Sequence, residues 1–173
     1  GKIQERKGLH LLAQALSNIN SKNIVLNIYG DGDETYKRKL KLINIKKRFI
    51  LNFYKPVPNI TKFLSLTDIL VLPSIKFESF GMVLIEAMRQ KVCVICSDSG
   101  GMKEIVTNNV NGLVFKNNDV DDLKKKLLIL INFNKKKKEF GKNGYLTFKN
   151  KFTNKVFIKE YEKIIIWKKL YLV

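Results

Sequence analysis

The sequence has no apolar run long enough to cross a membrane. Its longest uninterrupted apolar stretches, such as residues 127–131, are far shorter than the roughly 18 residues that a membrane-spanning helix needs. No charged and then apolar leader opens the chain. We therefore expect a soluble, cytoplasmic protein, and 173 residues with 45% hydrophobic content are enough for one globular domain.

Cysteine is also scarce, and both cysteines lie in the segment V-C-V-I-C as Cys93 and Cys96. A C-x-x-C pair can serve redox chemistry or bind a metal, but the β-branched neighbours favour a buried strand. Positions three apart in a strand point to opposite faces, which argues against a disulfide. We interpret the pair as two core thiols in a reducing compartment.

Acidic residues are few, with 15 against 33 lysines and arginines and a net charge of +18. The chain is rich in Lys, Ile and Asn throughout, as an AT-biased coding sequence would make it, so the charge alone proves little. A field this positive still attracts anionic lipid or phosphorylated substrates. No basic pattern interleaved with exposed aromatics and no recognisable nucleic-acid module stands out, so we expect no nucleic-acid partner.

Internal repeats and Gly/Ser linkers are missing too, and the hydrophobic pattern instead alternates between strand and helix periods. Strands are predicted at 24–29, 49–53, 69–72, 92–96 and 112–115. Helices are predicted at 7–19, around 36–43, around 60–66, at 80–89 and at 120–132, the last capped by Asp119. A further short helix is predicted to end at Val106. The run 69–72 is apolar throughout, as in a strand covered on both faces.

This alternation predicts the α/β fold class, a Rossmann-like doubly wound parallel sheet with helices on both faces. Two successive helices, at 135–149 and 154–170, form a C-terminal helical extension. We assign residues 1–150 to the sheet domain and residues 151–173 to its last helix.

Ligands of open parallel sheets bind beyond the carboxyl ends of the strands. The opening segment, residues 1–8, carries Lys2 and Lys7, which could both reach one anion, although most lysines are solvated surface groups. Gly30-Asp31-Gly32 follows a strand and allows a ligand to approach the backbone, but an ordinary turn is the favoured interpretation.

The segment 77–88 carries two glutamates, Glu78 in the loop at a helix start and Glu86 about two turns into an apolar helix. A carboxylate among apolar residues is costly to bury without a partner. A salt bridge to a lysine would supply one, and a ligand with a pair of hydroxyls is the functional alternative.

Together these segments resemble glycosyltransferase family 4, retaining enzymes with the GT-B fold. The resemblance covers nearly all of the chain. The matching segments are the G-x5-K-G opening (Gly1, Lys7, Gly8), Gly30-Asp31-Gly32, Thr67-Asp68, Pro73-Ser74, the E-x7-E motif (Glu78, Glu86), the segment 99–106 and the segment 111–114.

The resemblance implies a role for each matched residue. Glu78 would approach hydroxyls of the transferred sugar, and Glu86 would hold the ribose hydroxyls. Lys7 and Lys2 would clamp the diphosphate, Lys2 as a point charge where arginine is common. The amides at the helix start would cradle the diphosphate, as free N–H groups and the helix dipole favour an anion. The implied catalytic residues are Glu78 and Lys7, and the implied donor-binding residues are Lys2, Lys7, Gly30, Val57, Phe80, Gly81, Met82, Val83 and Glu86.

The implied activity is retaining transfer of a hexosyl or N-acetylhexosaminyl group from a nucleotide-sugar, UDP-sugar before GDP-sugar, without a metal or other cofactor. The acceptor would be a glycan or a lipid-linked molecule in surface polysaccharide, lipopolysaccharide or glycolipid synthesis. Because the family's acceptor domain precedes the first glycine, we expect that domain and the first strand of the sheet to be missing, and the isolated chain to be inactive. The alternative is a non-catalytic sugar-nucleotide-binding module or a truncated copy.

The tail combines apolar side chains with lysines. In the family the last helix packs against the acceptor domain, so docking is the favoured role, and attraction to an anionic surface at the inner face of the membrane is a second one. The apolar residues concerned are Phe152, Val156, Ile158, Tyr161, Ile164, Ile165 and Trp167.

Overall fold

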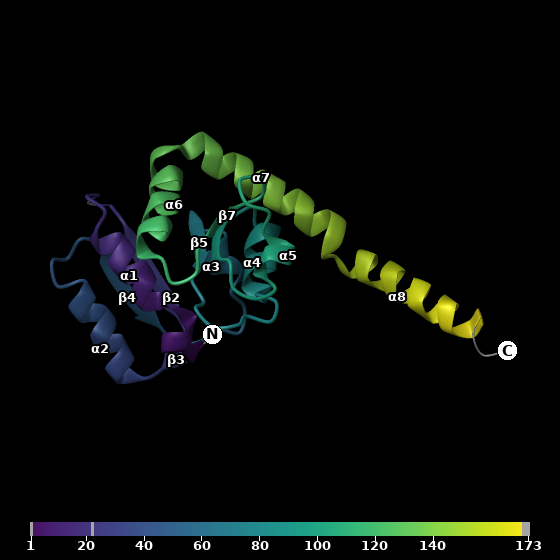
Figure 1. Cartoon of the computed structure of the whole chain (residues 1–173), viewed down its shortest axis with the longest axis horizontal. Helices are drawn as coiled ribbons and strands as arrows, with labels where there is room; N and C mark the ends of the chain where they lie inside the picture. The colour runs from purple at the N-terminus through teal and green to yellow at the C-terminus, as the bar shows by residue number, and fades with distance from the viewer. Residues whose placement is uncertain (1, 22, 171–173) are drawn as a thin grey trace.

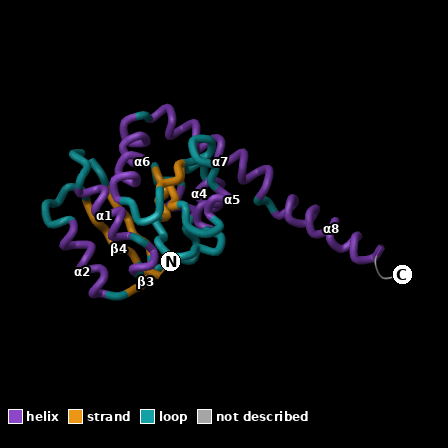
Figure 2. The backbone as a smooth tube through the Cα atoms, in the orientation of Figure 1, coloured by secondary structure: helices purple, strands orange, loops and turns teal. Residues whose placement is uncertain are grey.

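Short parallel strands alternate with helices up to residue 132, and two long helices follow (Figures 1 and 2). The structure, a computed structural model, describes residues 2–21 and 23–170. The strands are β1 (Lys2–Ile3), β2 (Val25–Tyr29), β3 (Asp31–Gly32), β4 (Ile50–Tyr54), β5 (Ile69–Leu72), β6 (Cys93–Ser97) and β7 (Leu113–Phe115). The helices are the 3-10 helix η1 (Glu5–Lys7), α1 (Leu9–Ser17), α2 (Glu34–Ile43), α3 (Thr61–Leu64), α4 (Met82–Arg89), α5 (Met102–Ile105), α6 (Val120–Asn132), α7 (Asn134–Lys151) and α8 (Asn154–Leu170).

Every strand pairing in the described chain is parallel, which confirms the predicted α/β class. Helix α6 covers the predicted residues, and the Asp119 side chain accepts a hydrogen bond from the Asp122 amide at 2.9 Å. The helix predicted at 7–19 is instead divided into η1 and α1, because Gly8 between them adopts a left-handed conformation with φ of 66°.

Two apolar cores lie on opposite faces of the strands. In β5, Ile69 and Val71 pack against one core, which α1, α2 and α6 complete, whereas Leu70 and Leu72 pack against the other, which includes α4 and α5. The helices therefore cover both faces, as predicted.

The two cysteines confirm the same alternation, because buried Cys93 belongs to the first core and buried Cys96 to the second. Burial raises the pKa of each thiol to about 12. Both are free thiols, in agreement with their interpretation as core residues.

The strands form three separately hydrogen-bonded groups, β1 with β3, β2 with β4, and β5 with β6 and β7. The prediction that the run 69–72 is covered on both faces is confirmed, because its side chains pack alternately against the two cores. All four residues of β5 are nevertheless only partly buried, whereas all five residues of β6 are buried. The reason is that, among the described strands, β5 is hydrogen-bonded to β6 alone.

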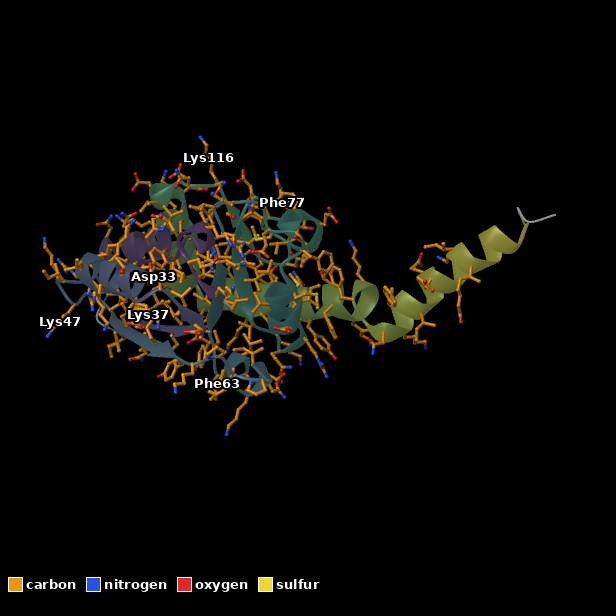
Figure 3. The ribbon with its side chains drawn as sticks, turned by 90° about the horizontal axis from the view of Figure 1, so that it is seen from below. Asp33, Lys37, Lys47, Phe63, Phe77 and Lys116 are labelled. Carbon is orange, nitrogen blue, oxygen red and sulfur yellow. The ribbon has the colours of Figure 1, made fainter. Side chains whose placement is uncertain are left out.

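The helical extension is confirmed. Helix α7 packs along α4 and β6, and α8 leads away from the body to the C-terminus (Figure 1). No helix in the described chain is long and apolar enough to span a membrane. Lysines cover much of the surface, and Lys47 and Lys116 extend outward in Figure 3.

Candidate functional site

A cavity of about 1040 Å³ opens where β2 and β5 end. Two loops and the start of α4 meet there, as expected for the carboxyl edge of a parallel sheet. The structure brings together most of the predicted site residues, since Lys2, Lys7, Val57, Glu78, Gly81, Met82, Val83 and Glu86 all line this cavity. Gly1, the first glycine of the opening motif, lies outside the described residues.

Lys7 and Glu78 form an ion pair at the centre of this group. The Lys7 Nζ lies 2.5 Å from the Glu78 Oε2, and the two side chains are only 22% and 18% exposed. The Ser74 hydroxyl donates to the same carboxylate oxygen at 3.0 Å. The two predicted catalytic residues, 71 positions apart in sequence, therefore contact each other directly.

The environment of Glu78 favours its charged form. Partial burial raises its pKa, but hydrogen bonds from Lys7 and Ser74, with the positive charges of Lys7 and Arg6, outweigh this effect and lower the pKa below the ordinary value of 4.5. Glu78 is therefore an ionised acceptor at neutral pH, suited to bind hydroxyl groups.

Ser74 is a functional candidate that the sequence reasoning missed. It had been counted only as part of the Pro73-Ser74 match, yet it is 1% exposed and holds Glu78. Its own carbonyl accepts a hydrogen bond from the buried Ser97 hydroxyl at 2.5 Å. A hydroxyl two residues after the end of an all-apolar strand was the signal available in the sequence.

Two glycines allow the backbone segments around Lys7 and Glu78 to approach. A Cβ on Gly8 would lie 1.8 Å from the Pro73 carbonyl oxygen, and a Cβ on Gly100 would lie 2.2 Å from the Glu78 carbonyl oxygen. Both residues also have positive φ, which glycine adopts without strain. A steric clash therefore explains why glycine follows Lys7 and why glycine stands at position 100.

The start of α4 presents free backbone donors. The amides of Phe80, Gly81, Met82 and Val83 have no acceptor among the described residues, and the first amide of this helix to be paired is that of Leu84, which donates to the Gly81 carbonyl at 2.9 Å. Unpaired N–H groups and the positive end of the helix dipole favour an anion. The arrangement can bind a phosphate group without any side-chain charge from α4.

Glu86, one turn further along α4, differs from the expectation of a buried carboxylate. It is exposed, lines the cavity, and has no hydrogen bond or ion pair to any described residue. The salt-bridge interpretation is therefore wrong for Glu86, and its carboxylate is free to accept hydrogen bonds from a ligand.

Two predicted residues are placed differently. Gly30 is buried, does not line the cavity, and donates its amide to the Tyr54 carbonyl at 3.0 Å. Phe80 also lies outside the lining, and its ring packs edge-on against Phe152.

The loop after β4 forms another wall, with Pro56 and Val57 in the lining. Next to it, the Tyr29 and Tyr54 rings stack at 4.8 Å, and the Phe63 ring contacts Tyr29 at the same centroid distance (Figure 3, Phe63 labelled). Sequence reasoning did not single out these aromatics. They hold the ends of β2 and β4 against α3.

Comparisons with known proteins show what this chain is similar to in sequence and fold. Residues 1–147 match the family described as glycosyl transferases group 1. The uncharacterized glycosyltransferase MJ1178 of Methanocaldococcus jannaschii is 32% identical over 98% of this chain and 43% of its own. A crystal structure of Anabaena Alr3699/HepE in complex with UDP-glucose superimposes with a TM-score of 0.85, at 21% identity, over 95% of this chain and 46% of its own.

A third similar protein is a single domain. The C-terminal domain of the group 1 glycosyl transferase LpcC from Francisella tularensis superimposes with a TM-score of 0.75 at 24% identity, over 89% of this chain and 84% of its own. The chain thus spans less than half the length of MJ1178 and HepE, and most of the LpcC domain.

Proposed function

The chain belongs to the group 1 glycosyltransferases, and we propose that its cavity binds the diphosphate and sugar of a nucleotide-sugar donor, UDP-sugar in preference to GDP-sugar. One observation carries the proposal: the unpaired amides of Gly81, Met82 and Val83 at the start of α4 line the same cavity as a lysine and an ionised glutamate. The similar HepE chain crystallised with UDP and with UDP-glucose, which supports a uridine nucleotide.

Each group then has a role in transfer. The amides of α4, with Lys7 and Lys2, neutralise the diphosphate as it leaves, which is the largest contribution to catalysis and needs no metal ion. Glu78, held by Ser74, accepts hydrogen bonds from the sugar, and Glu86 accepts them from the ribose. Pro56 and Val57 cover the base. The sugar is transferred with retention of configuration.

Donor binding changes the partners of Lys7. In the structure its ammonium pairs with Glu78. A diphosphate cradled by the adjacent amides attracts the same ammonium, so Lys7 shares its three donors between Glu78 and phosphate. The ion pair therefore holds Lys7 in the cavity before the donor arrives.

The activity of the whole protein follows from the donor domain and a second half. We assign it hexosyl or N-acetylhexosaminyl transfer to a glycan or lipid-linked acceptor of surface polysaccharide or glycolipid synthesis. The chain alone transfers no sugar, because donor and acceptor must be held together for reaction. Measurable transfer by residues 1–173 would overturn this part of the proposal.

Helix α8 serves the contact with that half. Phe157, Ile158, Tyr161, Ile164 and Ile165 are all about half exposed or more, and their spacing places them on one side of the helix. Val156 and Phe152 lie nearer the body, and the side chain of Trp167 lies outside the described residues. Basic residues of the same helix favour an anionic membrane surface as a second contact.

Calorimetric titration tests the central part. UDP and GDP are titrated into the chain with and without EDTA, and we expect heat from UDP that the chelator leaves unchanged. No heat from either nucleotide, or heat abolished by EDTA, would refute the donor site. A full-length protein that binds UDP-sugar yet transfers nothing would favour a non-catalytic binding module.

A further inference from the structure

Two side chains outside the cavity hold the backbone that leads to Glu78. The Ser97 hydroxyl, at the end of β6, donates to the Ser74 carbonyl at 2.5 Å. The Asn117 side-chain amide, in the loop after β7, donates to the Ile75 carbonyl at 2.9 Å. Neither Ser97 nor Asn117 lines the cavity. We call these two residues the carbonyl clamp, because they hold the carbonyls of two consecutive residues just beyond the end of β5.

The amides of the same backbone donate to the segment that carries Lys7. The Ile75 amide donates to the Arg6 carbonyl at 3.0 Å, and the Lys76 amide approaches the same oxygen at 3.5 Å. In a trans peptide group the N–H and C=O bonds point in opposite directions. The peptide groups 74–75 and 75–76 are therefore held between Arg6 on one side and the carbonyl clamp on the other.

The backbone of Asn117 is itself held on both sides. Its amide donates to the Asp98 side chain at 2.8 Å, and the Asp98 amide donates to the Phe115 carbonyl at 3.0 Å. The preceding amide, that of Lys116, donates to the Asp122 side chain of α6 at 2.8 Å. The loop after β7 is thus fastened to the loop after β6 and to α6, so the Asn117 side chain extends from a fixed base.

The hydrogen bond to Ile75 determines how the Asn117 side chain lies. If its amide were reversed, Oδ1 would face the Ile75 carbonyl oxygen, and two acceptors would meet. In the observed orientation Oδ1 is buried and has no hydrogen-bond partner among the described residues. A buried unpaired oxygen costs free energy, and a side chain that served packing alone would gain nothing from it. The bond to the Ile75 carbonyl is therefore the feature that calls for a role.

The clamped peptide groups lie between the two donors of the Glu78 carboxylate. The Ser74 hydroxyl donates to Oε2 at 3.0 Å, and the Lys7 Nζ lies 2.5 Å from the same oxygen. Ser74 opens the first clamped peptide group, and Lys7 directly follows Arg6, the acceptor of the Ile75 amide. A rotation of these peptide groups would therefore shift both donors relative to the carboxylate.

We propose that the carbonyl clamp, and Asn117 in particular, positions Glu78 for the hydroxyls of the transferred sugar. Asn117 acts through the backbone of residues 75–78 and lies outside the cavity, so it is a positioning residue and not a catalytic one. Its loss should lower the gain in affinity that glucose gives to UDP-glucose over UDP. UDP binding itself should change by a smaller factor, because the α4 amides lie outside the clamp. This sugar readout rests on the proposed function.

Asn117→Leu is the test variant, and Asn44→Leu is its matched control. Leucine nearly keeps the volume of asparagine, removes the donor, and also removes the unpaired oxygen. Asn44 is likewise partly buried, donates its side-chain amide to a backbone carbonyl, that of Phe49, at 2.7 Å, and has a buried Oδ1 without a partner in the described chain. It precedes β4 and does not line the cavity. The control therefore makes the same chemical change away from the site.

The first measurement needs no ligand. The pKa of Glu78 is measured by ¹³C NMR titration of its carboxyl group in the parent and both variants. Partial burial raises the pKa of Glu78, but hydrogen bonds from Lys7 and Ser74 lower it below 4.5. Asn117→Leu should raise this pKa toward 4.5, and Asn44→Leu should leave it unchanged. An unchanged pKa in Asn117→Leu, or an equal rise in both variants, would overturn the proposal.

The second measurement is calorimetry with UDP and UDP-glucose. The ratio of their dissociation constants, UDP over UDP-glucose, should fall roughly three- to tenfold in Asn117→Leu, as expected when one hydrogen bond is misplaced. Asn44→Leu should keep the parent ratio. In a Glu78→Ala background, Asn117→Leu should cause no further fall, because it acts through Glu78. A parent-like ratio in Asn117→Leu, or a further fall in the double variant, would refute the positioning role.

The two measurements separate the clamp from the proposed function. A parent chain that binds UDP-glucose no more tightly than UDP would refute the sugar contact of Glu78, and the pKa of Glu78 would then decide whether the clamp holds its carboxylate. Circular dichroism checks that each variant folds. If Asn117→Leu does not fold, Ser97→Ala removes the other donor of the clamp and is measured in the same two ways, with the same expected and contradicting results.

Discussion

Replacing Lys7 by methionine tests the donor cavity through its best-defined contact. The substitution keeps the apolar stem but removes an ammonium that lies 2.5 Å from Glu78, with both side chains about four-fifths buried. A hydrogen bond to a charged group contributes about 1.5–3 kcal/mol. If Lys7 also donates to the diphosphate, Lys7→Met should weaken UDP binding roughly ten- to a hundred-fold.

Lys39→Met is the matched control. Lys39 also forms an ion pair with a glutamate, at 2.8 Å from Glu5, but both of these side chains are more than half exposed and neither lines the cavity. Both variants lose one positive charge, so calorimetric titration with UDP at fixed ionic strength separates local contact from overall charge. Equal affinities in Lys7→Met and the parent, or equal losses in the two variants, would refute the assignment of Lys7.

Three further outcomes are expected. Glu86→Ala should weaken UDP binding on the order of ten- to a hundred-fold, because the free carboxylate of Glu86 holds ribose hydroxyls. Glu78→Ala should leave UDP binding nearly intact but remove the gain in affinity that the sugar gives to UDP-glucose. Calorimetry with both ligands checks this, and two variants that bind both ligands like the parent would show that the motif was misread. Gly100→Ala should lower the free energy of unfolding by about 1–3 kcal/mol in urea titration, because the φ of Gly100 is 64° and an added Cβ would meet the Glu78 carbonyl. Gly144→Ala is the control. The nearest atom to its added Cβ, at 3.0 Å, belongs to the flexible Met88 side chain, so the free energy of unfolding should change little. Finally, folding lowers the pKa of Glu78 below 4.5, so the stability that its ionised form contributes is present above pH 4.5 and is lost as the pH falls through the lower folded value. The difference in free energy of unfolding between the parent and Glu78→Gln should therefore shrink on acidification. A difference that does not depend on pH would contradict the role of the ion pair.

Local patterns predicted the helices and strands well where a single physical cause acts within one element. Asp119 caps α6 as its position before an apolar repeat indicated, and Cys93 and Cys96 point to opposite faces because strands alternate. Burial of β5 could not be predicted in this way, since it depends on a neighbouring strand and not on its own four apolar residues.

Residue types and spacing also predicted most of the site, but not its contacts. Lys7 and Glu78 were expected near one ligand, yet only the fold shows that they pair with each other and that Ser74 holds them. Gly30 and Phe80 belong to matching motifs, but neither lines the cavity. The Gly30 amide pairs with the Tyr54 carbonyl, and the Phe80 ring packs on Phe152. Such orientations arise from tertiary packing, which no motif records.

The most direct test of the account is where a uridine nucleotide binds. The ¹⁵N-labelled chain is titrated with UDP in the presence of EDTA, and amide resonances are followed by NMR. We expect the largest shifts at the four unpaired amides before and within the first turn of α4, namely Phe80, Gly81, Met82 and Val83, with smaller shifts at Lys7. Saturable shifts confined to surface lysines away from this cavity, or no shifts at millimolar UDP, would contradict the proposed donor site.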